Sequence, residues 1–173
     1  IGSVSKRFAA PGLRIGYAIA EPDTVRRLAD IGWLLAMSPG TDDQLRAAEM
    51  LVGDLKTPRR LAQTTAALEA ACDTALKALH DHGFTVRRPS GGPLLWISLP
   101  QAGGTGADLA THCRQQAGII TTPGEAFGFT EAPALRCCYA LPPDTVAPVF
   151  DRLGVALAGW RKAAPRQTLA GFA

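Results

Sequence analysis

The sequence predicts a mixed α/β protein that ends in a small α/β sandwich, with helices on one face of a sheet. Two observations carry this prediction. Residues 57–163 alternate in the order helix, strand, strand, helix, strand, strand, helix. The chain of 173 residues is also 47% apolar and 19% charged, which is enough for a buried core and excludes a disordered segment.

The first elements are predicted from turn and capping signals. The opening residues favour two apolar strands joined by a Pro-Gly turn at 11–12. A helix follows over 24–37. Thr41 and Gln44 fit a capping box with acidic residues in the first turn, which predicts a second helix over 41–55.

The second part of the chain opens with a long helix. It is predicted to begin at Thr57, an N-cap followed by proline, and to end before Gly83, a glycine suited to the position after a helix. Helices of this length often bridge two domains. Apolar runs and helical periodicity predict the rest: strands over 84–86, 94–99, 119–122 and 135–141, and helices over 107–117 and 143–163.

Composition narrows the function classes. The net charge of +3 is mild and the basic residues are scattered, a pattern that does not favour nucleic acid as a partner. No apolar run reaches the roughly 18 residues of a membrane helix, and no secretory signal is visible. The four cysteines lack C-x-x-C spacing, so buried reduced thiols in a cytoplasmic protein are favoured over a disulfide framework or a metal site.

The strongest chemical pattern lies at the start of the chain, where Ser3, Ser5 and Lys6 precede Arg14 by a few residues. A lysine held in an apolar strand and loop can act as a Schiff-base nucleophile. A hydroxyl and a guanidinium fork nearby would suit a phosphate, because the fork can bind two oxygens at once. Taken one at a time, these residues are common in any loop.

Together, residues 2–17 resemble the cofactor-lysine signature of the class I/II aminotransferases, which are fold type I pyridoxal-phosphate enzymes. In that family the lysine holds the cofactor as a Schiff base. The serine three residues before it and the arginine eight residues after it contact the cofactor phosphate. The resemblance therefore implies that Lys6 is catalytic, that Ser3, Lys6 and Arg14 bind pyridoxal 5'-phosphate, and that Ser5 is a further candidate ligand.

Later segments resemble the same family in the same order. They are the Gly-Gly stretch at 91–96, the Pro-Gly loop at 123–128, and Arg136 in a predicted strand. The family's arginine at this place binds the substrate α-carboxylate with two hydrogen bonds, and a surface strand cation is the alternative reading of Arg136. Pro93 departs from the aromatic residue or methionine that relatives often carry, which leaves the side-chain specificity open.

The resemblance also implies a domain organisation. Residues 1–56 would be the C-terminal part of the large cofactor-binding domain, 57–164 the small C-terminal α/β sandwich domain, and 165–173 a loose tail. The chain begins at Ile1, and the family's other cofactor groups precede the lysine. We therefore expect a longer protein, dimeric when complete, and this chain alone can be inactive.

The function implied is transfer of an amino group between an amino acid and a 2-oxo acid. The amino donor and acceptor stay open, and so do decarboxylation, racemisation and elimination on the same scaffold. The main alternative is the aminotransferase-like effector domain of a winged-helix transcriptional regulator, whose lysine motif is similar. No metal is predicted, because the three histidines have no cysteine or carboxylate at ligand spacing and are expected to be exposed on helices.

Overall fold

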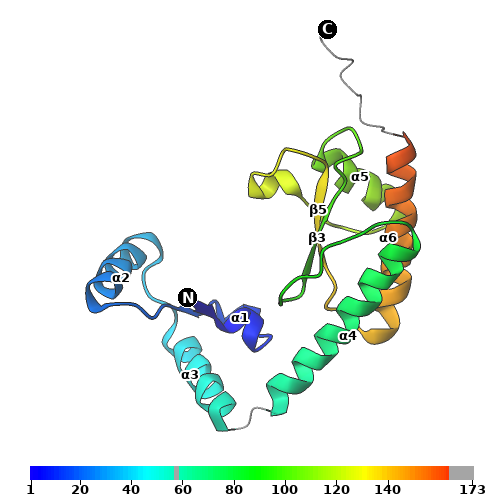
Figure 1. The fold of residues 1–173 in the computed structure, drawn as a ribbon. Helices are drawn as coiled ribbons and strands as arrows, with labels where there is room; N and C mark the ends of the chain where they lie inside the picture. Colours follow the sequence, from blue (N-terminus) through cyan, green and yellow to red (C-terminus); the bar gives the residue numbers. More distant parts are fainter. Residues whose placement is uncertain (57–58, 164–173) are drawn as a thin grey trace. The chain divides into compact units, whose positions relative to one another are not determined.

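The structure, a computed structural model, describes residues 1–56 and 59–163, with the backbone alone for 54–56 and 59–61 (Figure 1). The elements, in chain order, are β1 (Gly2–Ser3), α1 (Val4–Arg7), η1 (Pro11–Leu13), β2 (Gly16–Tyr17), α2 (Pro22–Ala36), α3 (Thr41–Lys56), α4 (Arg59–Asp81), β3 (Leu94–Ser98), α5 (Gly106–Ala117), β4 (Thr122–Pro123), η2 (Gly124–Phe127), β5 (Ala134–Cys138) and α6 (Pro143–Ala163). The predicted α/β class is confirmed. The helix start predicted at Thr57 and the tail predicted over 165–173 lie outside the described residues.

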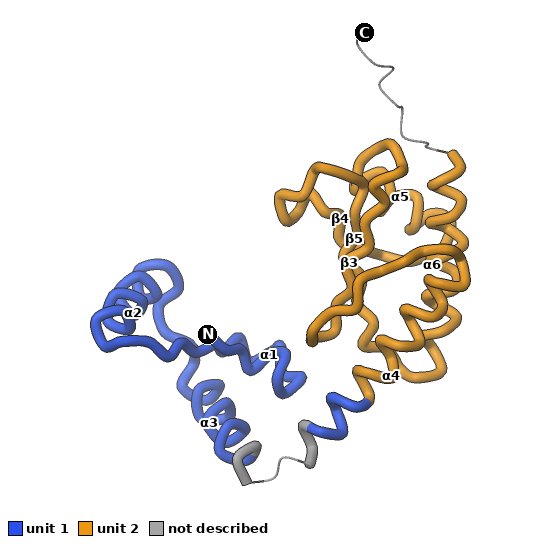
Figure 2. The backbone as a smooth tube through the Cα atoms, viewed as in Figure 1, with its two compact units in different colours: residues 1–66 blue, residues 67–173 orange. Residues whose placement is uncertain are grey.

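The chain divides into two compact units, residues 1–66 and 67–173 (Figure 2). The division falls within α4. Within the described part of the chain, no helix combines the length and the apolar composition needed to span a bilayer. The assignment of 1–56 and 57–164 to the large and small domains of a longer enzyme remains a prediction.

Unit 2 contains the predicted sandwich. Its sheet has the order β3-β5-β4 with both pairings antiparallel, so β5 is the central strand. In the register, Leu95 lies opposite Cys137 and Ile97 opposite Leu135, and all four side chains are buried. Alternate residues of a strand point to opposite faces, which gives the sheet one buried face and one open face.

Helices α4, α5 and α6 pack on the buried face and form one core with it (Figure 1). The residues in this core that are less than 2% exposed are Ala75, Leu79, Leu95, Ile97, Leu109, Cys113, Leu135, Val146, Phe150, Leu153 and Leu157. Helix α6 spans the residues predicted, since the Pro143 start and the apolar periodicity agree.

Two predicted strands fail for the same physical reason, and a third, predicted over 135–141, ends at Cys138. The strand at 84–86 does not form. Instead Phe84 N–H donates to Leu79 O at 3.1 Å and Gly83 N–H to His80 O at 2.8 Å, which closes the end of α4 as a Schellman motif. The strand predicted at 119–122 shrinks to β4 because Ile119 N–H donates back into α5. An amide used in a helix cap is not free for a strand ladder.

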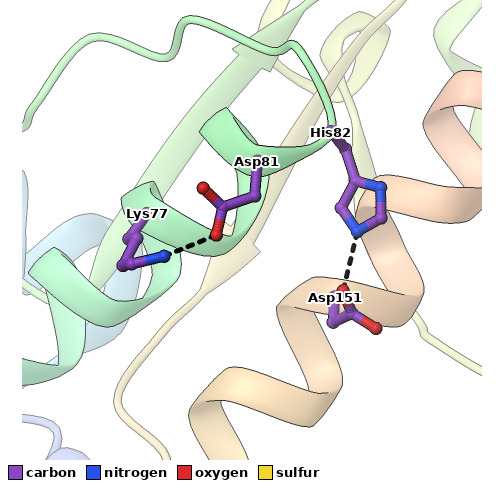
Figure 3. A network of polar contacts seen from close by, with 4 residues as sticks. All are labelled: Lys77, Asp81, His82 and Asp151. Carbon is purple, nitrogen blue, oxygen red and sulfur yellow. Dashed lines mark hydrogen bonds and ion pairs between the residues drawn. The ribbon is translucent and has the colours of Figure 1, made fainter.

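The predicted exposure of the histidines is wrong for two of the three. His82 and His112 are half-buried against α6. His82 Nε2 lies 2.7 Å from Asp151 Oδ1, and His112 Nε2 lies 3.0 Å from the Ala156 carbonyl oxygen. Figure 3 shows the first of these contacts, which joins the residue after α4 to α6. His82 therefore connects the end of α4 to α6, and His112 connects α5 to α6.

The close packing of α6 against His82 gives a stability prediction. A methyl group at Gly154 would overlap the imidazole ring, so Gly154→Ala should displace His82 and weaken its contact with Asp151. Overpacking costs about 1–3 kcal/mol, and the gain in helix propensity of about 1 kcal/mol offsets only part of it. We expect the free energy of unfolding to fall by about 1 kcal/mol, measured by urea titration.

Gly159 is the matched control in the same helix. A methyl group there would meet only His112 Nε2 at 3.7 Å, an ordinary contact. Gly159→Ala should therefore raise the free energy of unfolding by about 0.5–1 kcal/mol. Equal urea midpoints for the two variants would contradict the packing described for Gly154.

The adjacent cysteines give a labelling prediction. As predicted for a strand, Cys137 is buried and Cys138 is exposed. Burial raises the pKa of Cys137 to about 12 and that of Cys113 to about 11, so these two thiols hold little of the reactive thiolate at neutral pH. In the native full-length protein at pH 8, Cys138 should alkylate with iodoacetamide roughly tenfold or more faster than either. Peptide mass spectrometry measures the alkylation rates. Comparable rates for Cys137 and Cys138 would contradict the placement of these two side chains on opposite faces of β5.

Candidate active site

The lysine region is a helical turn, α1, where the sequence predicted the end of a strand and the start of a loop. Ser3 has extended backbone angles and is the N-cap of α1, where its Oγ accepts a hydrogen bond from Ser5 N–H at 3.2 Å. Phe8 N–H donates to Val4 O at 3.0 Å and closes the turn. Lys6 lies in the middle of this turn with its side chain exposed. The serine cap is the reason for the difference, because it favours helix over strand in the residues that follow.

A short strand pair brings the predicted phosphate ligands into one small structure. Ser3 lies opposite Gly16 in the antiparallel pairing of β1 with β2, and Val4 N–H donates to Ile15 O at 3.1 Å. Arg14 is therefore the residue next to this ladder. The β1–β2 pair places Ser3 and Arg14 at the same end, beside the turn that carries Lys6.

Arg14 has a backbone conformation that few residues adopt. Its φ is +53°, in the left-handed region, at the end of η1. One nitrogen of its guanidinium donates to Pro11 O at 3.1 Å, and the side chain is otherwise exposed. A guanidinium has five N–H donors, so most of them remain for a ligand. Backbone strain of this kind costs roughly 1–3 kcal/mol and clusters at functional sites.

The donor set around Lys6 fits a phosphate group. The Ser3 hydroxyl uses its oxygen as an acceptor for Ser5 N–H and keeps its own O–H to donate. Arg14 adds a positive charge and paired donors. At the adjacent position Gly2, a Cβ atom would collide with the Tyr17 ring, so only glycine allows this close pairing. Ser5 is half-buried, and its backbone amide is already used by Ser3.

Arg136 lies in unit 2, on the open face of the central strand. Its backbone pairs with Trp96 of β3 on one side and Thr122 of β4 on the other. The Phe127 ring lies against its guanidinium, with Cζ 4.5 Å from the ring centroid. Arg136 is half-buried, and no carboxylate among the described residues pairs with it. The Arg136 guanidinium is therefore held in position and partly shielded from solvent, and its N–H groups remain available to a ligand.

The loop that carries Phe127 is held at both ends. Glu125 Oε1 accepts a hydrogen bond from Gly106 N–H at 2.6 Å, at the first residue of α5. Gly128 N–H donates to Glu125 O at 3.0 Å, and Phe129 N–H to Gly124 O at 3.1 Å. A carboxylate at a helix N-terminus is stabilising. The short helix η2 is thus fixed to α5 at one point and closed on itself at the other.

The sequence did not identify the aromatic group around Arg136. Trp96 lies on the open face and is 36% exposed. Its ring meets Phe127 at 5.9 Å and Phe129 at 5.4 Å, edge to face. The available signal was the strand alternation, which puts Trp96 on the face opposite buried Leu95. The cross-strand pairing with Arg136 was not readable from the sequence.

The predicted site residues fall into two groups. Ser3, Ser5, Lys6 and Arg14 lie together in unit 1, and Arg136 lies in unit 2. Among the described residues, no three metal-ligating side chains gather into a cluster.

Relatives of known function match most of the chain. The family model described as "Aminotransferase class I and II" matches residues 1–153. The LL-diaminopimelate aminotransferase of Nitratidesulfovibrio vulgaris (strain Hildenborough) is 30% identical over 132 residues, which are 73% of this chain and 31% of that protein. The aromatic-amino-acid aminotransferase 1 of Thermococcus litoralis is 29% identical over 130 residues, 73% of this chain and 30% of that protein. The chain spans about a third of the length of these relatives.

Solved structures agree on the fold. The aromatic aminotransferase from Pyrococcus horikoshii OT3 superposes with a TM-score of 0.77 at 23% identity, over 92% of this chain and 42% of that one. LysN, an α-aminoadipate aminotransferase from Thermus thermophilus solved with N-(5'-phosphopyridoxyl)-L-leucine, gives a TM-score of 0.75 at 26% identity, over 89% and 40%. The predicted fold type I class is confirmed for the part of that fold that this chain covers. The chain belongs to the class I and II aminotransferase family.

Proposed function

We propose that the full-length protein is a pyridoxal 5'-phosphate-dependent aminotransferase that moves an amino group from an amino acid to a 2-oxo acid. The observation that carries the proposal is the grouping of Ser3, Lys6 and Arg14 in one strand pair and turn, within a member of this family. A lysine amine beside a phosphate-binding donor set suits this cofactor and few others.

Each residue has a role in the proposed reaction. Ser3 and Arg14 bind the phosphate and thereby fix the distance between the cofactor and the lysine. Lys6 Nζ is the amine that would condense with the cofactor aldehyde, with loss of water. When bound, pyridoxal phosphate supplies an electron sink for the pair left at the substrate Cα. As a free amine beside the bound substrate, Lys6 Nζ would accept the proton from the substrate Cα and hold it for its return.

Arg136 is proposed to bind the α-carboxylate of the substrate. A guanidinium fork that donates to both carboxylate oxygens fixes the Cα–H bond in direction. Its half-buried place on the open sheet face, without a competing carboxylate among the described residues, supports this role. The alternative, a surface strand cation with no ligand, is distinguished by the Arg136 variants described in the Discussion.

The test of the cofactor site is chemical. The full-length protein is mixed with pyridoxal phosphate, reduced with borohydride, digested and analysed by mass spectrometry. We expect the phosphopyridoxyl mass on the peptide that contains Lys6, and none on Lys77 or Lys162. The unreduced protein should move amino groups from an L-amino acid to a 2-oxo acid. Label on another lysine alone, or no amino transfer with any substrate pair, would overturn the proposal.

The relatives described above are all named as aminotransferases and give no support to the transcriptional-regulator alternative.

We further propose that the complete protein is a homodimer in the cytoplasm. Four free cysteines support a reducing compartment. Helix α2 has no buried residue, which leaves its apolar side chains available for contact with another protein chain and supports the dimer. Its exposed apolar side chains are Val25, Leu28, Ile31, Trp33, Leu34 and Leu35. Light scattering of the full-length protein measures its mass, and a monomer would contradict the dimer.

A further inference from the structure

We propose that Phe127 is a positioning residue for Arg136, which it holds by the face of its guanidinium so that the in-plane N–H groups stay free for a carboxylate. The Cζ atom of Arg136 lies 4.5 Å from the centroid of the Phe127 ring. The proposal rests on the proposed function for the identity of the carboxylate, which would be that of the amino acid substrate.

An arginine side chain can be held in place by a carboxylate or by an aromatic ring. An aspartate or glutamate partner would orient Arg136 but would occupy its donor fork, which is the part that a substrate carboxylate needs. An aromatic ring instead attracts the cation through its π face. All five N–H donors point outward in the guanidinium plane, so a ring against the face orients the group and consumes none of them.

Phe127 is itself held in place by neighbouring residues. Trp96, which lies directly opposite Arg136 in the strand register, meets the Phe127 ring edge to face at 5.9 Å and 72°. The loop below is fastened by the hydrogen bond from Gly106 N–H to Glu125 Oε1 at 2.6 Å. The ring is thus supported from the sheet and from α5, and is not a free loop side chain.

The aromatic rings also reduce the contact of Arg136 with water. Trp96 is 36% and Phe127 49% exposed, so the rings leave Arg136 half-buried rather than closed off. A cation on a partly apolar surface attracts a carboxylate more strongly than a fully hydrated one does. The aromatic pair therefore has two effects on one residue: it orients the guanidinium and reduces its hydration.

Phe129 provides the matched control. Its ring meets Trp96 at 5.4 Å and 89°, much as Phe127 does. Among the described residues, however, only Phe127 has its ring over the Arg136 guanidinium. A leucine at either position removes an aromatic contact with Trp96. Only the leucine at 127 removes the contact with the cation.

The kinetic experiment uses the full-length protein with bound pyridoxal phosphate. The probe is whichever of the standard L-amino acids reacts fastest in a single-turnover half-reaction. Phe127→Leu should raise the half-saturating concentration of this amino acid roughly three- to thirtyfold, with a much smaller change in the limiting rate. Phe127→Tyr keeps a ring face and should restore the value to within about twofold. Phe129→Leu should also stay within about twofold of the unchanged protein.

A second readout does not need the reaction. Phenylglyoxal modifies arginine side chains, and peptide mass spectrometry follows its addition to Arg136. With the ring removed, Phe127→Leu should react several-fold faster at Arg136, whereas Phe129→Leu and Phe127→Tyr should keep the original rate. Thermal denaturation of all variants shows whether a change comes from loss of the fold.

The two measurements separate the two claims. If no amino acid reacts, the proposed function fails, while faster modification in Phe127→Leu alone still supports the positioning of Arg136. The inference is overturned if folded Phe127→Leu keeps both the original half-saturation and the original modification rate. It is also overturned if Phe129→Leu changes both as much as Phe127→Leu does.

Discussion

Replacing Lys6 by alanine in the full-length protein should reduce amino transfer by roughly a thousandfold or more. The proposed role gives this single amine two tasks, covalent attachment of the cofactor and movement of the Cα proton. General acid–base catalysis alone contributes about 10²- to 10⁴-fold. The visible absorption band of the lysine-bound cofactor should disappear in the same variant.

The Lys6→Ala variant should lose activity without losing stability against unfolding. The Lys6 side chain is exposed and lies in the four-residue turn α1, so its removal leaves no cavity and no unpaired buried charge. Lys162→Ala, in the last turn of α6, is the matched control and should keep both the band and the activity. Retention of the original turnover by Lys6→Ala would rule out the proposed mechanism.

Replacing Arg136 by glutamine should lower kcat/KM by about 10²- to 10⁴-fold. Each hydrogen bond between charged groups contributes about 1.5–3 kcal/mol, and a bidentate carboxylate contact contains two of them. Arg136→Lys keeps the charge and loses the fork, so it should fall between the glutamine variant and the unchanged protein. Steady-state kinetics with the fastest amino acid measures the series.

Arg152→Gln is the control for Arg136, because this arginine is exposed on α6 and has no role in the proposed site. It should leave kcat/KM within about twofold of the original, as for most surface substitutions. A matching amine that lacks the α-carboxylate should react equally poorly with the Arg136→Gln variant and with the unchanged protein. If Arg136→Gln reacts with amino acids at the original rate, Arg136 is a surface cation only.

The sequence predicted the elements whose signals are local. The helix over 143–163 and the strands within 94–99 and 135–141 were found because proline starts, apolar runs and turn residues agree along the chain, although the second strand ends at Cys138. The strands predicted at 84–86 and 119–122 were wrong or too long because the sequence does not show which backbone hydrogen bonds their first residues make. In both cases the residue after the C′ glycine, Phe84 or Ile119, could pair with a strand or cap the preceding helix, and the cap was formed.

The candidate site was predictable as a set of residues but not as an arrangement. Spacing and family resemblance pointed to Lys6 and Arg136. The helical turn α1 that carries Lys6, which the Ser3 cap begins, was not predicted. The aromatic contact between Phe127 and Arg136 depends on the register of β3 with β5 and on the path of η2. Neither is encoded in any short segment.

The central position of β5 has a consequence for redesign of the protein. Because this strand is hydrogen-bonded on both sides, a substitution that moves its backbone must disturb two ladders at once, whereas η2 is connected to its surroundings by few bonds. Directed evolution toward new substrates should accordingly leave the strand that carries Arg136 almost constant. Its changes should collect at loop residues such as Ala126, which is exposed and has none of the contacts described for Phe127.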